Sequence, residues 1–116
     1  MLAHQARLAE LRRRGLWPPQ LPAVVLAEVL TGDHRRDFHT NHLLGLCQIR
    51  DVTERLARDA AVLRTRTRRR RNVAATDAIV AAFACTLDDP IILTSDLEDL
   101  EALVARSQKT VRVARA

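Results

Sequence analysis

The stretch that decides the fold is residues 91–104, IILTSDLEDLEALV. Residues 91–94 form an apolar, β-branched run bounded by turn signals, a pattern typical of a buried strand. Ser95 and Glu98 have the spacing of a capping box, so we expect the next helix to begin at Ser95. A buried strand that leads directly into a helix is a building unit of α/β folds.

Strands and helices alternate along the rest of the chain in the same way. Thr53 is a suitable N-cap for one of the helices, and Gly15 is a suitable stop for the first. Strands separated by helices imply right-handed crossovers, so the expected class is α/β with a small, mostly parallel sheet between helices. The expected strands are residues 21–26, 48–52, 91–94 and 110–113, and the main expected helices are residues 1–14, 33–46, 54–68, 77–87 and 96–104.

Composition predicts one globular domain over residues 1–116. Hydrophobic residues make up 47% of the chain and charged residues 28%, which is the balance of a folded protein. The net charge is +5, carried by eighteen arginines and a single lysine, Lys109. Arginine matches phosphate geometry better than lysine does. The charge is therefore compatible with a nucleic-acid partner, and the alternative is a composition that simply uses arginine in place of lysine.

The two cysteines, Cys47 and Cys85, lie in apolar contexts that are typical of free thiols in a reducing compartment. The amino terminus has no signal-peptide core, and no apolar run approaches the roughly 18 residues that span a bilayer. We therefore expect a cytoplasmic protein with no membrane partner.

Four carboxylates lie beside short apolar runs. Glu28 ends the first run, Asp77 opens a helix, Asp96 follows the strand at 91–94, and Asp99 comes one helical turn later. In open α/β sheets, ligands bind beyond the carboxyl ends of the strands. A group of carboxylates there suits Mg²⁺ and metal-assisted hydrolysis of a phosphodiester. Taken singly, Asp77 and Asp99 also suit a structural role, because acids stabilise the first turn of a helix.

Three segments containing these acids resemble the acidic motifs of PIN domains, and in particular the VapC-type toxins of bacterial toxin–antitoxin systems. The segments are PAVVLAEVL (residues 22–30), ATDAIVAA (residues 75–82) and ILTSDLEDL (residues 92–100). They occur in the family's order, and the resemblance runs from about residue 8 to residue 113.

The resemblance implies a PIN-like three-layer fold and an endoribonuclease that depends on Mg²⁺ or Mn²⁺. It also implies a homodimer that is neutralised by a small antitoxin of the VapB type. Carried over by motif, the catalytic and metal-binding residues are Glu28, Asp77, Asp96 and Asp99. Thr94 or Ser95 would supply the supporting hydroxyl.

The chain departs from the family pattern at its beginning. PIN domains start with a central buried strand that ends in a metal-binding aspartate, whereas this sequence begins in a helical pattern. We therefore expect an N-terminally truncated domain. The DNA just upstream is expected to encode the absent strand of about five residues in frame.

A basic run precedes the helix that begins at Asp77. It places six arginines in eight residues: Arg64, Arg66, Arg68, Arg69, Arg70 and Arg71. Such a run binds nucleic-acid phosphates independently of base sequence, which predicts an RNA-binding role. The alternative interpretation is a helix end that is simply solvated.

Three functional hypotheses follow from these patterns. The first is a metal-dependent ribonuclease toxin. The second is a catalytically inactive PIN remnant that binds an antitoxin or RNA. The third is a purely basic RNA-binding module that does not need the four acids.

Overall fold

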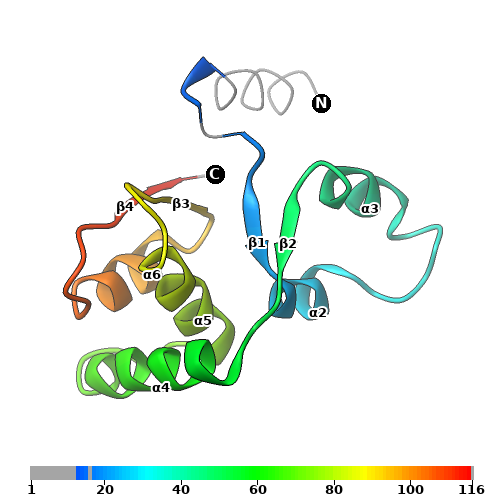
Figure 1. The fold of residues 1–116 in the computed structure, drawn as a ribbon. Coiled ribbons are helices and arrows are strands. Elements are labelled where there is room, and N and C mark those ends of the chain that lie inside the picture. The colour runs from blue at the N-terminus through cyan, green and yellow to red at the C-terminus, as the bar shows by residue number, and fades with distance from the viewer. Residues whose placement is uncertain (1–12, 16, 116) are drawn as a thin grey trace. The chain divides into compact units, whose positions relative to one another are not determined.

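The computed structural model describes residues 13–15 and 17–115 of the chain. The helix expected over residues 1–14 lies almost wholly outside them. Gly15 has a φ of +71°, the left-handed conformation in which a glycine ends a helix. The chain divides into two compact units, one up to Arg50 and one from Asp51, and each is described by itself (Figure 1). The single domain over residues 1–116 therefore stays a prediction.

The described residues of the first unit, 13–15 and 17–50, form a parallel pair of short strands and three short helices. Strands β1 and β2 lie side by side in Figure 1, and Leu21 is in register with Ile49. The elements are β1 (Gln20–Pro22), the 3₁₀ helix η1 (Ala23–Val25), α2 (Leu26–Val29), α3 (Phe38–Leu44) and β2 (Gln48–Arg50).

The strand predicted over residues 21–26 is wrong beyond Pro22. The chain turns there into η1 and then α2, although Val24 and Val25 favour strands. Proline has no N–H to continue a strand ladder, and its φ of −63° is compatible with a helix start. The backbone chemistry of Pro22 therefore overrides the side-chain pattern that follows it.

The helix predicted over residues 33–46 is shorter than expected because two aspartates organise the turn before it. Asp33 accepts a hydrogen bond from the backbone N–H of Arg35 at 2.9 Å. The buried carboxylate of Asp37 accepts the backbone N–H groups of Thr31 and Gly32 at 2.9 and 2.8 Å. These local bonds compete with helix formation, so α3 begins only at Phe38.

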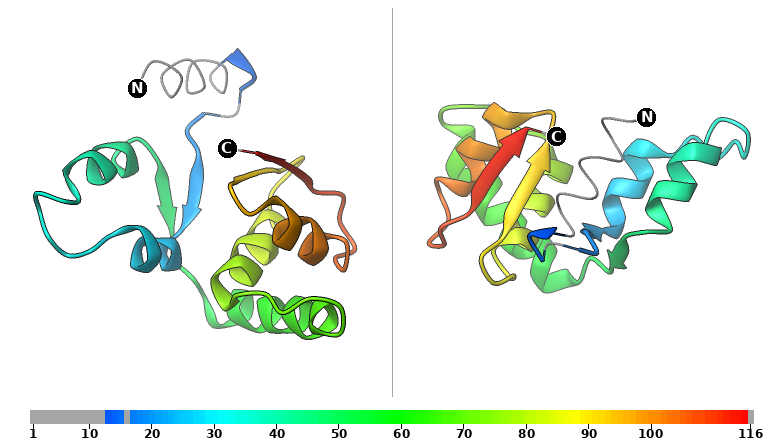
Figure 2. Two further views of the ribbon diagram at one scale, coloured as in Figure 1. Left: turned by 180° about the vertical axis from the view of Figure 1, so that it is seen from behind. Right: turned by 90° about the horizontal axis from the view of Figure 1, so that it is seen from above.

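The second unit holds helices packed on a parallel strand pair. Strands β3 and β4 run side by side, as the right panel of Figure 2 shows, with Ile92 in register with Val113. Helix α5 contacts α4, α6 and β3, while α6 contacts both strands. The elements are α4 (Glu54–Arg68), α5 (Ala75–Ala84), β3 (Ile91–Thr94), α6 (Leu97–Val104) and β4 (Arg112–Arg115).

Helix α4 confirms its sequence prediction at both ends. The hydroxyl of Thr53 accepts the backbone N–H of Leu56 at 3.1 Å and so satisfies one of the free donors at the helix start. Leu56, Ala60 and Leu63 form its buried face. On the facing helix, α5, the most buried residues are alanines, which allow α4 and α5 to approach closely.

The α/β class and the parallel strand pairing are confirmed, but the strands do not form one sheet. The described residues make two separate two-stranded parallel sheets, β1–β2 and β3–β4. Among the same residues, no helix is long and apolar enough to cross a membrane.

Candidate metal centre

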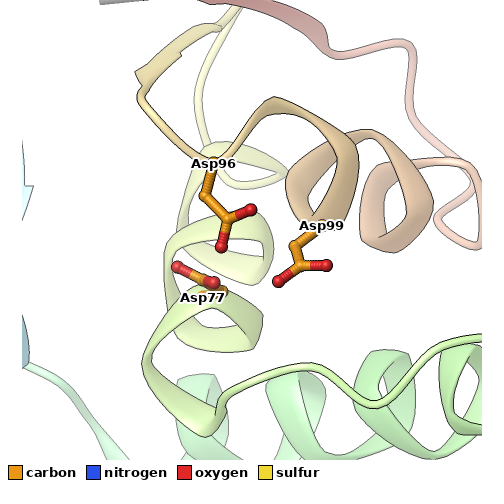
Figure 3. A group of neighbouring side chains, drawn as sticks. All are labelled: Asp77, Asp96 and Asp99. Atoms are coloured by element: carbon orange, nitrogen blue, oxygen red, sulfur yellow. The ribbon is translucent and has the colours of Figure 1, made fainter.

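Three of the four predicted acids meet in the second unit. Asp77 lies in the first turn of α5, Asp96 links β3 to α6, and Asp99 lies in the first turn of α6. Each offers a carboxylate oxygen, and these oxygens lie within 4.8 Å of one another. Figure 3 shows the three side chains pointing toward a common point. Three of the four acids singled out from the sequence thus lie together, and their role as metal ligands stays a prediction.

The loop between β3 and α6 positions Asp96 through its backbone. The hydroxyl of Thr94 accepts the backbone N–H of Asp96 at 2.9 Å. Asp96, not Ser95, occupies the N-cap position of α6, and its side chain makes no capping bond there. The helix start predicted at Ser95 is therefore one residue early, and the N-cap residue makes no capping bond. The carboxylate of Asp96 projects instead toward Asp77 and Asp99 (Figure 3).

Asp99 pairs with the guanidinium of Arg71, a residue that is distant in the sequence. The Nε of Arg71 donates to Asp99 Oδ1, and Nη2 of the same guanidinium lies 3.2 Å from Glu98 Oε2. This hydrogen bond from Arg71 is the main reason that the pKa of Asp99 lies below its usual value. Sequence reasoning missed this pair, because no local pattern connects residues 28 positions apart.

Glu28, the fourth predicted acid, is exposed on α2 in the first unit. The described acidic group consists of the three aspartates of the second unit. A role for Glu28 as a further ligand therefore stays a prediction. Ser95 is exposed and Thr94 is half-buried, and of the two only Thr94 has a described bond to the loop that carries Asp96.

The predicted arginine run separates into three structural roles. Arg64 is half-buried, and its Nε donates to the carbonyl of Val73 at 2.9 Å, which ties the loop after α4 back to that helix. Arg71 contacts the acids. The remaining four are exposed: Arg66, Arg68, Arg69 and Arg70.

The donor set fits a hard divalent cation. It consists of oxygens only, as Mg²⁺ prefers, and Mg²⁺ usually keeps several waters beside one or two carboxylates. Oxygens on opposite sides of one Mg²⁺ are about 4.2 Å apart, because each bond is about 2.1 Å. The 4.8 Å spread of the three aspartates is therefore within a small side-chain rotation of a shared site.

Comparisons with protein-family models, with curated proteins and with solved structures found no match to this chain.

Proposed function

We propose that this protein is a Mg²⁺- or Mn²⁺-dependent endoribonuclease with a PIN-like fold, of the kind that a small antitoxin neutralises. The observation that carries the proposal is the convergence of Asp77, Asp96 and Asp99 from two helices and the end of a strand. The order of the three acidic motifs along the sequence supports the same reading.

The chain's residues contribute in two ways to this chemistry. Asp77, Asp96 and Asp99 would hold the cation, which supplies an activated water and stabilises the leaving oxygen when bound. The Thr94 hydroxyl fixes the backbone of Asp96 and so keeps that carboxylate aimed at the other two. A fixed ligand set matters because Mg²⁺ demands a nearly ideal geometry.

The exposed arginines supply affinity for the substrate backbone. Arg68 ends α4, and Arg69 and Arg70 follow in the turn that leads to Arg71, which contacts the acidic group. Guanidinium groups pair with phosphates through two parallel hydrogen bonds. We therefore assign the RNA backbone to this turn and the scissile phosphate to the acids beside it.

The test is cleavage of a structured RNA by the purified chain in Mn²⁺, in Mg²⁺ and in EDTA. We expect cleavage only with metal, and a loss of at least about 100-fold in Asp77→Asn, since even changes beyond the direct ligands cost 10–100-fold. Asp59→Asn, on the exposed face of α4, is the matched control and should keep full activity. Cleavage that persists in EDTA would show that the metal mechanism is wrong.

A second function, RNA binding without cleavage, is favoured by one observation. Only three carboxylates form the described group, and Arg71 already neutralises one of them. In this case the chain would bind RNA but leave it intact at millimolar Mn²⁺. Asp77→Asn would then bind RNA as tightly as the unmodified chain does.

A further inference from the structure

Arg71 is the one basic side chain of the arginine run with described contacts to the acidic group. Its guanidinium reaches two neighbouring carboxylates of α6, with Nε on Asp99 and Nη2 on Glu98. The side chain of Asp99 is only 17% exposed, whereas that of Arg71 is 45% exposed. The carboxylate of Asp99 is thus largely buried, whereas the Arg71 guanidinium that pairs with it is accessible to solvent.

This contact competes with a metal ion at the same carboxylate. Asp99 Oδ1 accepts the Arg71 Nε–H, so one of the two oxygens of this carboxylate is already engaged. A divalent cation and a guanidinium on one carboxylate also repel each other. The Arg71 contact therefore opposes metal binding at Asp99, and a cation bound there weakens that contact.

A phosphodiester offers Arg71 an alternative partner. The planar fork of arginine pairs with phosphate as readily as with carboxylate. Arg71 follows directly after exposed Arg68, Arg69 and Arg70, so an RNA backbone that lies along this turn brings phosphates to it. Exchange of a carboxylate for a phosphate leaves the guanidinium paired and releases Asp99.

We propose that Arg71 is a displaceable counter-ion that holds Asp99 and Glu98 until an RNA phosphate draws it away. The inference rests on the proposed function, because it assigns a regulation to the same metal centre. Its consequence is that metal binding and RNA binding strengthen each other. RNA draws Arg71 away from Asp99, which favours the metal, and the metal displaces Arg71 from Asp99, which favours RNA. Such coupling is reciprocal by thermodynamic linkage.

The first test measures Mn²⁺ affinity without nucleic acid, by electron paramagnetic resonance of the free ion. Arg71→Gln should bind Mn²⁺ roughly fivefold more tightly than the unmodified chain, because this is the upper end of what an exposed ion pair contributes. Arg70→Gln removes the same charge one residue away and should change the affinity by less than about twofold. Arg71→Lys, which keeps the charge and loses the fork, should fall between them.

The second test measures binding of a fluorescent RNA oligonucleotide by anisotropy, with and without Mn²⁺, with a gel to verify intact RNA. Mn²⁺ should tighten RNA binding in the unmodified chain and in Arg70→Gln, and should do so less in Arg71→Gln. An oligonucleotide of the same sequence with a neutral methylphosphonate backbone should lose the effect.

The outcomes separate this inference from the proposed function. Equal Mn²⁺ affinities of Arg71→Gln and Arg70→Gln would overturn the role of Arg71, while Mn²⁺ binding that Asp99→Asn abolishes would leave the metal centre standing. Absence of any Mn²⁺ binding that depends on Asp99 would overturn both. A thermal melt of each variant verifies that it is folded before the comparison.

Discussion

Asp37 is a buried carboxylate whose role is structural. Its two oxygens accept the backbone N–H groups of Thr31 and Gly32 and the hydroxyl of Thr31 at 2.8–3.1 Å. The hydrogen bond from the Thr31 backbone is the main reason that the pKa of Asp37 lies below its usual value of 3.8. A carboxylate stabilised in the folded state lends that stability only while it is ionised.

We therefore predict an acid-dependent loss of stability in the first unit. Because the folded pKa of Asp37 is lowered, its contribution is complete above pH 3.8 and is lost as the pH falls below that value, through the folded pKa. Asp37→Asn should melt at a lower temperature than the unmodified chain at pH 7, and the difference should shrink below pH 3.8.

Fluorescence of Trp17, the chain's single tryptophan and part of this unit, reports the melt. A difference that stays constant with pH, or one that Asp59→Asn reproduces, would contradict the assignment.

At the same scale, sequence patterns singled out three acids that lie together in the structure, but they did not predict what those acids contact. Asp77, Asp96 and Asp99 stood out because an ionised carboxylate beside an apolar run needs a compensating cation or solvent. The partner of Asp99 did not stand out, since Arg71 belongs to a run that reads equally well as a phosphate-binding segment. Pairing between distant residues depends on how α4 and α6 pack, which no local pattern encodes.

Elements were predictable where one local signal dominated. Thr53 before an amphipathic pattern placed α4 correctly, and the β-branched run at residues 91–94 placed β3. Two predicted boundaries were wrong where local signals conflict. Pro22 interrupts the apolar run that was predicted to be one strand. Thr94 accepts the backbone N–H of Asp96, and α6 begins one residue later than the capping pattern at Ser95 predicts.

The turn that follows α4 yields a prediction about RNA binding. Arg68, Arg69 and Arg70 are exposed, and each phosphate they neutralise on a single strand contributes about −0.7 to the slope of log K against log salt concentration. Replacing all three with alanine should flatten that slope by about 2. Arg55→Ala, near the opposite end of α4, should change it little. An unchanged slope in the triple variant would place the RNA elsewhere on the protein.

At the scale of the whole molecule, the two units differ in how they are held together. Every residue of the buried hydrophobic core found in the described part of the chain belongs to the unit from Asp51. The described residues of the first unit contain exposed apolar side chains instead, among them Phe38, Leu46 and Ile49. Composition averaged over 116 residues predicted one core and could not reveal this uneven distribution.

Burial of apolar surface is the main stabilising contribution to folding, so the unit from Asp51 should open less often than the described part of the unit before it. Hydrogen exchange on the full chain, followed by mass spectrometry of peptic fragments, measures this directly. Amides of α4 and α5 should exchange at least roughly tenfold more slowly than those of β1 and α3. Equal rates would mean that the chain opens as a single cooperative body, and that the weakly buried strands β1 and β2 draw their stability from the same core. Slow exchange confined to α4, α5 and α6 would instead show that the helices carrying Asp77 and Asp99 stay folded while the first unit opens.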